Sequence, residues 1–172
     1  MSKNTDNILV KIDFWILDTL FQPLANRLPG EKMNLRVGTN LVLGSVIFSF
    51  AFLLLPMFLY GVGLFHSTYN LMSCVMMSCF YAYVHQSQGL VREGFVNPLR
   101  YHLFGIRIIS IPFALYSVYI WMTAGTLVGR ITLFYCISNI LSVCGLYLVS
   151  CNVNPPKKQE HRKAVFSENP FS

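Results

Sequence analysis

The chain of 172 residues is rich in apolar residues and poor in charge: 54% are hydrophobic, 15% are aromatic and only 12% are charged. Water-soluble domains have about 25% charged residues, so this composition excludes an ordinary soluble domain and indicates a membrane protein. The net charge of +6 does not indicate nucleic-acid binding, because the cations flank apolar segments, where they contact lipid headgroups and set orientation. We therefore expect the lipid bilayer, and no nucleic acid, among the partners, together with other membrane protein subunits or further copies of the same chain.

Residues 1–30 are predicted to form an amphipathic helix that lies in the membrane interface. Its polar residues fall within about 60° of each other on a helical wheel, and apolar residues cover the broad opposite side. The polar group consists of Asn7, Lys11, Asp18 and Gln22. Asp13 lies within the apolar arc and weakens the pattern.

Two aromatic residues of this helix, Phe14 and Trp15, are expected to anchor it at the acyl boundary. Pro23 is expected to kink or end the helix, because proline removes a backbone hydrogen bond. Pro29 and Gly30 then predict a turn before the first membrane span.

The region 37–91 contains no Asp, Glu, Lys or Arg. It is too long for one crossing and suits two helices of about 20 residues joined by a turn. Glycines and polar residues cluster at 61–70, so we place the first span at 38–60 and the second at 68–88.

The second half of the chain predicts another hairpin, with spans at 108–126 and 131–152 and a tight turn at 125–130. Asn97 and Pro98 predict the start of the third helix below the membrane, with Asn as the N-cap and Pro at the first helical position. The segment 154–172 is basic and lacks apolar periodicity, so it is predicted to be a disordered tail. The predicted fold class is therefore all-α and polytopic, with four transmembrane helices in two hairpins after the interfacial helix.

The distribution of cations predicts the orientation of the chain. Of the 13 Lys and Arg residues, five lie in the N-terminal segment, three between 89 and 107 and four in the tail, whereas Arg130 alone lies in an opposite turn. Positive residues concentrate on the cytoplasmic side, so both termini and the 89–107 loop are expected there. We expect this membrane to be the bacterial inner (plasma) membrane.

The residues that carry enzyme chemistry are not grouped in this sequence. All seven acidic residues lie outside the predicted spans, and no nucleophile with its base, no metal-ligand spacing and no family motif is recognised. The five cysteines form no CxxC pair and are predicted to be free packing residues. We therefore expect no catalytic residue, no bound metal and no cofactor.

Two stripes of small and polar residues on the first and fourth predicted spans are candidates for helix packing. Small residues allow helices to approach closely, and Ser or Asn can hydrogen-bond between helices. The candidates are Ser45 and Ser49 on the first span and Ser138, Asn139 and Ser142 on the fourth. Asn139 is expected to be the polar anchor of the bundle, and these stripes either pack within one chain or dock another membrane subunit.

Arg130 is the candidate for binding a partner or an anion. It defies the charge asymmetry, and it lies near the positive end of the fourth helix dipole. A lipid phosphate satisfies such a residue, and so does a partner's carboxylate or an anionic solute. The function we expect is that of a small non-enzymatic accessory or interaction subunit of a larger membrane assembly, or a contact-dependent immunity or exclusion protein. The alternative is an oligomeric channel or transporter component for a neutral or anionic solute.

Overall fold

The computed structural model describes residues 8–30, 32–61 and 63–153, and within this part of the chain every regular element is helical. The predicted tail at 154–172 lies outside the described residues. The elements, in chain order, are α1 (Ile8–Ile16), the π turn η1 (Leu17–Phe21), α2 (Gln22–Arg27), α3 (Met33–Tyr60), α4 (Leu64–Ser87), the 3-10 turn η2 (Gln88–Leu90), α5 (Leu99–His102), α6 (Phe104–Thr123) and α7 (Thr126–Ser150).

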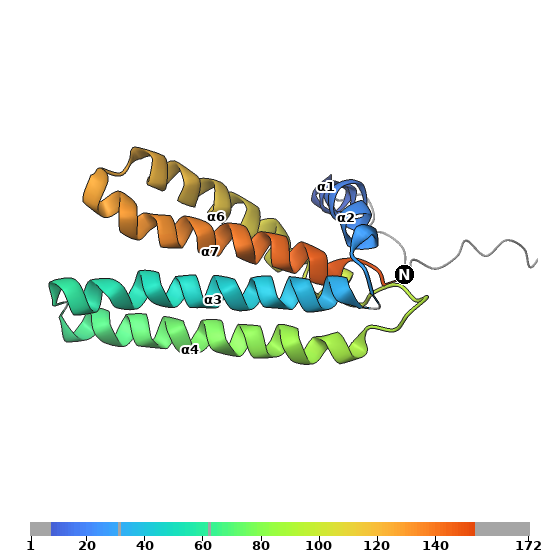
Figure 1. Ribbon diagram of the computed structural model, residues 1–172, viewed down its shortest axis with the longest axis horizontal. Helices are drawn as coiled ribbons and strands as arrows, with labels where there is room; N and C mark the ends of the chain where they lie inside the picture. Colours follow the sequence, from blue (N-terminus) through green and yellow to red (C-terminus); the bar gives the residue numbers. More distant parts are fainter. Residues whose placement is uncertain (1–7, 31, 62, 154–172) are drawn as a thin grey trace, which may run out of the picture.

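Helices α3 and α7 form the centre of the bundle, with α4 packed on α3 and α6 packed on α7 (Figure 1). Two glycines allow the central pair to approach closely. A Cβ atom on Gly38 would lie 2.6 Å from Cγ2 of Val149, and one on Gly145 would lie 2.7 Å from the carbonyl oxygen of Gly38. The backbones of α3 and α7 therefore meet where neither helix carries a side chain.

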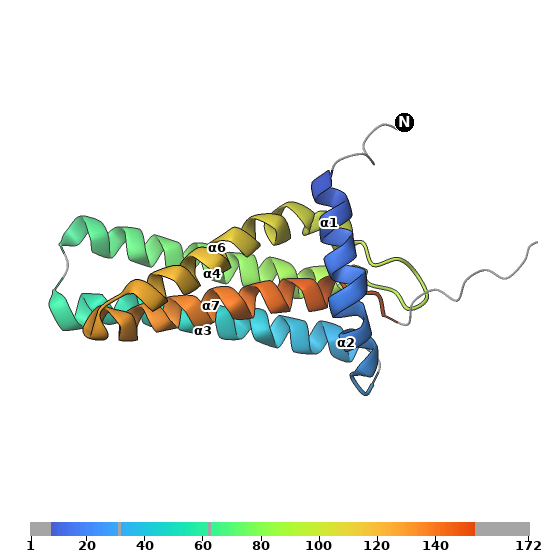
Figure 2. The ribbon, with the colours of Figure 1, turned by 90° about the horizontal axis from the view of Figure 1, so that it is seen from above.

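Helix α4 runs antiparallel to α3 along most of its length (Figures 1 and 2). Near its beginning, Nδ2 of Asn70 donates a hydrogen bond of 2.9 Å to the carbonyl oxygen of Leu53, late in α3. Just beyond its end, the amide of Gln88 donates to the hydroxyl of Thr39, early in α3. The two helices therefore cover the same layer of the molecule.

Three helical segments are long and apolar enough to cross a membrane: Met33–Tyr60, Phe104–Thr123 and Gly129–Ser150. They support the prediction of an all-helical integral membrane protein. Helix α4 has the length of a span but carries more hydroxyl, amide and imidazole groups than the other three.

The helices extend beyond the predicted spans into charged sequence. Helix α3 begins at Met33, before the span predicted from residue 38. A short helix, α5, begins directly after Asn97 and Pro98, where the third helix was expected to start, and α6 follows from Phe104. The predicted turn at 125–130 is shorter than expected, since α7 begins directly after its N-cap Gly125.

The segment from α1 to α2, which we call the strap, lies crosswise at one end of the bundle (Figure 2). Pro23 was expected to kink or end this helix, yet the helix continues to Arg27. The π turn just before shifts the hydrogen-bonding register, so Pro23 falls in the first turn of α2, where a missing N–H is tolerated.

Candidate functional site

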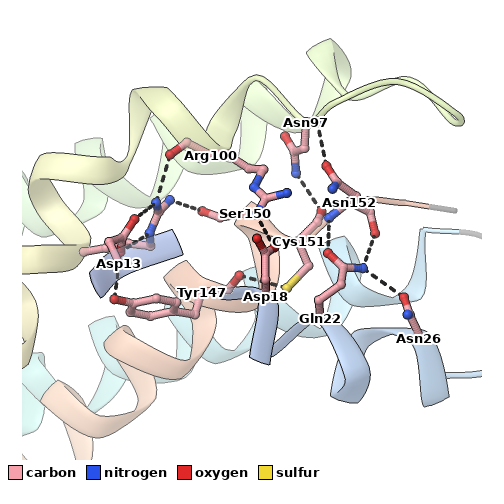
Figure 3. A network of polar contacts seen from close by, with 11 residues as sticks. Asp13, Asp18, Gln22, Asn26, Asn97, Arg100, Tyr147, Ser150, Cys151 and Asn152 are labelled. Atoms are coloured by element: carbon pink, nitrogen blue, oxygen red, sulfur yellow. Dashed lines mark hydrogen bonds and ion pairs between the residues drawn. The ribbon is translucent and has the colours of Figure 1, made fainter. Parts of the chain in front are cut away.

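A buried ion pair joins the strap to the bundle. Asp13 of α1 accepts hydrogen bonds from Nε of Arg107 at 3.1 Å and from its Nη2, and both side chains are completely buried. Two neighbours complete the site: Tyr147 donates its hydroxyl hydrogen to Oδ1 of Asp13 at 2.8 Å, and Nη1 of Arg107 donates to the hydroxyl of Ser150 at 2.7 Å. Three helices, α1, α6 and α7, thus meet at one carboxylate (Figure 3).

Backbone oxygens satisfy the remaining donors of this arginine. Its Nη1 and Nη2 donate to the carbonyl oxygens of Leu99 and Arg100, the latter at 2.8 Å. A buried charge is tolerated only where it is paired and hydrogen-bonded, and Arg107 meets both conditions. The hydrogen-bonding groups of Asp13 and Arg107 are therefore occupied within the fold.

A second ion pair lies beside the first. Arg100 donates to Asp18 of the strap, and its guanidinium carbon lies 5.3 Å from the ring centroid of Phe14. Phe14 also contacts Tyr101 edge to face, with ring centroids 5.6 Å apart. Phe14 therefore packs on α5, whereas Trp15 next to it is 62% exposed. The two predicted interfacial anchors face different surroundings.

Amide side chains satisfy the carbonyl oxygens at the end of α7 (Figure 3). Nδ2 of Asn97 donates to the carbonyl oxygens of Val149 and Cys151, both at 2.8 Å. Oδ1 of Asn97 accepts from the backbone N–H of Leu99 at 2.9 Å, which is the capping contact that its position before Pro98 predicts. Oε1 of Gln22, in the strap, accepts a hydrogen bond of 2.9 Å from the backbone N–H of Asn152. The carbonyl groups of Val149 and Cys151, which helix geometry leaves without a partner, are thus satisfied by a side chain of the same molecule.

The thiol of Cys151 belongs to the same polar junction, just after the end of α7. It is completely buried, and its Sγ lies 3.3 Å from the carbonyl oxygen of Tyr147. Burial raises the pKa of this thiol to about 12, although Arg100 and Arg107 act in the opposite direction. The sulfur is therefore a protonated packing group at neutral pH, and all five cysteines of the chain are free.

The sequence pattern did not identify the residues of the buried pair. Asp13 was interpreted as a flaw in the apolar arc, and Arg107 as one of several cations below the third span. An acidic residue on the apolar side of a helix was the available signal, since such a position is buried and demands a cationic partner. Which cation pairs with Asp13 depends on how the strap crosses the bundle.

The predicted packing serines lie between α3 and α7. The hydroxyls of Ser49 and Ser138 are 2.6 Å apart, and Ser138 also donates to the carbonyl oxygen of Ser45 at 2.8 Å. Asn139 instead donates to the carbonyl oxygen of Tyr135 in its own helix, at 2.8 Å. Ser142 is half-buried on the same helix. These hydrogen bonds between the two helices are thus made by serines, whereas the hydrogen bond of the Asn139 amide stays within α7.

Arg130 lies at the end of the bundle opposite the strap and is exposed. It borders a shallow depression whose other lining residues are Trp121, Met122, Ala124, Gly125, Gly129 and Leu133. The site is open, so an anion held there would remain in contact with its surroundings. Of the described residues, no group of three or more His, Cys, Asp or Glu could hold a metal ion.

The outward side of α4 carries an exposed row of residues that we call the α4 stripe. Its members follow one another at alternating intervals of four and three residues, so they share one face of the helix. They are Phe65, Tyr69, Met72, Met76, Cys79, Tyr83 and Gln86, all exposed. The opposite side of α4 faces α3 and contains the buried residues Cys74 and Val84.

Comparisons with known protein families, with curated proteins and with solved structures find no match to this chain. Its function is therefore argued from its own residues.

Proposed function

We propose that the chain crosses the membrane four times, as the hairpins α3–α4 and α6–α7, with both termini on the cytoplasmic side of a bacterial inner membrane. The fourth crossing is supported by two hydrogen bonds. Asn70, near the beginning of α4, bonds to Leu53 late in α3, and Gln88, just after the end of α4, bonds to Thr39 early in α3. If α3 crosses the bilayer, α4 therefore passes through the same layer. The orientation is supported by the twelve cations on one side against one on the other.

We infer that the protein is a non-enzymatic accessory or interaction subunit, and that it docks another membrane protein through the α4 stripe. The observation that carries this proposal is the mismatch between the composition of α4 and its exposure. It is the least apolar of the four long helices, yet it exposes most of its surface. Tyr and Met are enriched at protein interfaces, and Met adapts its shape to a partner.

The polar groups of α3 and α7 also support an interaction role over transport. A transport path needs polar side chains that line a water-filled route through the membrane. The hydroxyls of Ser49 and Ser138 instead hydrogen-bond to each other, and Ser138 donates to the carbonyl oxygen of Ser45. The hydroxyl of Ser45 donates to the carbonyl oxygen of Val42 in its own helix. These serines hold the bundle together, so the outward α4 stripe is left as the surface for a partner.

A steric block in the middle of the α4 stripe tests this proposal. The tagged chain is isolated from its native membrane in mild detergent, and co-isolated proteins are identified by mass spectrometry. We expect Cys79→Trp to abolish recovery of a partner that the wild-type chain recovers. Leu115→Trp on α6, where Leu115 is 67% exposed, is the matched control and should leave recovery unchanged.

A differently tagged second copy in the same cells tells self-association from a foreign partner. Equal recovery of every protein by wild type and Cys79→Trp would overturn the proposal. Loss of the partner from both tryptophan variants would show that the effect is not specific to the α4 stripe, and would overturn it as well.

Arg130 is proposed as an additional contact to a carboxylate or other anion at the outer end of the bundle. Support comes from its exposure and its position in the first turns of α7, where the helix dipole already favours negative charge. Arg130→Gln should weaken partner recovery, and Arg130→Lys should retain part of it, since lysine keeps the charge but loses the bidentate geometry. Wild-type recovery with Arg130→Gln would assign this residue to lipid phosphate alone.

A further inference from the structure

The strap has one side that is held by the bundle, and charge contributes much of the hold. Asp13 and Asp18 of the strap meet Arg107 and Arg100, which come from the segment that begins α5 and α6. Apolar contacts at the same side include Leu17, which is completely buried, and Phe21, whose ring stacks on Tyr147 with centroids 4.7 Å apart. Asp13 thus ties the strap to α6 and α7, and Asp18 ties it to α5.

The strap also has an apolar edge that the bundle does not cover. Six large apolar residues of the strap are between 48% and 69% exposed: Ile8, Leu9, Ile12, Trp15, Leu20 and Leu24. They lie at the end of the bundle where α3 begins and α7 ends (Figures 1 and 2), which is the level of a bilayer surface if these helices cross the membrane.

Charge at this end of the molecule identifies the surface that fits the edge. The exposed cations Arg27, Lys32, Arg36 and Arg92 lie in or next to the strap, at the start of α3 and in the loop before α5. Exposed apolar residues beside cations match the interface of an anionic lipid bilayer, where acyl chains meet phosphate.

We propose that the strap docks on the surface of an anionic bilayer and is coupled rigidly to the bundle by Asp13. Asp13 is a positioning residue: its carboxylate joins the lipid-facing helix α1 to Arg107 of α6 and Tyr147 of α7. The position of the strap on the bilayer surface thereby sets the position of α6 and α7 relative to that surface. The α4 stripe takes no part in this coupling. The lipid docking and the coupling are therefore tested independently of the proposed partner.

The lipid contact is tested by the fluorescence of Trp15 in nanodiscs of anionic phospholipid. The chain has two tryptophans, so Trp121→Phe leaves Trp15 as the single reporter. We expect lipids brominated near the headgroup to quench Trp15 more strongly than lipids brominated near the chain end. Equal or absent quenching by both lipids would overturn the docking.

The coupling is tested by a distance measurement between spin labels on the exposed positions 19 and 40, one in the strap and one on α3. The labels are attached through non-natural amino acids so that the native cysteines stay. We expect a single narrow distance for the wild type and a broad distribution for Asp13→Asn, with the quenching of Trp15 retained. Glu93→Gln removes one exposed carboxylate from the same end and should leave the narrow distance unchanged.

The double variant Asp13→Asn with Arg107→Gln guards against misfolding, because it leaves no unpaired charge in the interior. It should also give a broad distance while the bundle remains helical. A narrow, wild-type distance in either variant would show that Asp13 does not couple the strap to the bundle, and would overturn the proposal.

Discussion

At the residue scale, the Asp13–Arg107 pair is completely buried and hydrogen-bonded to its neighbours on both sides. Replacement of a buried ion pair by apolar residues is often neutral, whereas removal of one partner costs about 3–5 kcal/mol. Such a pair therefore contributes more to the choice of one arrangement than to net stability. Here it selects the register in which the strap crosses α6, because the carboxylate must meet Nε and Nη2 of Arg107 and the hydroxyl of Tyr147 together.

The hydroxyl of Tyr147 gives a direct test of this site. Tyr147→Phe keeps the ring that stacks on Phe21 but removes the donor to Asp13. Because hydrogen bonds to charged groups contribute about 1.5–3 kcal/mol, we expect a loss of this order in the free energy of unfolding, measured by detergent titration. The control is Tyr119→Phe, since Tyr119 is 64% exposed. An equal effect of both substitutions would contradict the role given to the Tyr147 hydroxyl.

At the element scale, the pairing of α3 with α7 depends on two glycines, which carry no side chain at the closest approach of the two helices. Gly38 and Gly145 face each other: a Cβ atom on Gly38 would lie 2.9 Å from the carbonyl oxygen of Gly145, and one on Gly145 would lie 2.7 Å from that of Gly38. Close backbone approach increases the dispersion contacts that drive helix association in lipid, where the hydrophobic effect between helices is absent. Further along, Ser45, Ser49 and Ser138 add hydrogen bonds to the same seam.

Gly145→Val is expected to separate α3 from α7. The added Cβ would lie 2.8 Å from Cγ2 of Val42 and 2.9 Å from its backbone nitrogen, and backbone atoms have little freedom to yield. Overpacking of this kind costs about 1–3 kcal/mol in unfolding free energy. Gly105→Val makes the same change on α6, where the new Cβ meets no atom within 4 Å, and serves as the control. Similar unfolding curves for the two variants would count against the close approach.

The serine hydrogen bonds between α3 and α7 predict that Ser138 contributes more to stability than Asn139, whereas the sequence predicts Asn139 as the polar anchor. Ser138→Ala removes the bonds to Ser49 and to the carbonyl oxygen of Ser45, and should cost roughly 0.6 kcal/mol, at most about 1.7. Asn139→Leu removes a bond within α7 and should change the unfolding free energy less. Thermal unfolding of both variants in the same detergent decides the order. If Asn139→Leu is the more destabilising change, Asn139 is the anchor that the sequence predicted.

At the scale of the whole molecule, the chain brings most of its described polar contacts to one end. The strap, the loop before α5 and the end of α7 meet there, whereas the other end has the two short connections between helices (Figure 2). This asymmetry agrees with the distribution of Lys and Arg, which predicts that the polar end lies on the cytoplasmic side.

Cysteine labelling in a background without the five native cysteines measures that orientation. Gly63→Cys and Gly125→Cys lie in the two short connections, and Glu93→Cys lies at the polar end. An impermeant maleimide should label the first two positions in intact cells and the third only after lysis, because positive residues are retained in the cytoplasm. Labelling of Glu93→Cys from outside would reverse the orientation. Labelling of only one of the two connections from outside would disprove the two-hairpin topology.

The amino-acid sequence alone was enough to predict a membrane protein of long apolar helices. Hydrophobic length decides whether a helix suits a bilayer, and this property is local. It also pointed to Ser45, Ser49 and Ser138, because small polar residues on apolar helices are rare enough to attract notice. The helices extend past the predicted spans into charged sequence, because the apolar stretch sets the part that suits the bilayer and not the whole length of a helix.

Only the tertiary structure decided which polar residues act together. Asp13 and Arg107 are 94 positions apart, and their pairing depends on the strap lying crosswise over α6. The local pattern made Asp13 a defect in an amphipathic helix, and the fold makes it the residue on which three helices converge. Burial changes the role of such a residue. A charged side chain is solvated in water, but once the surrounding helices exclude water it requires a partner of opposite charge.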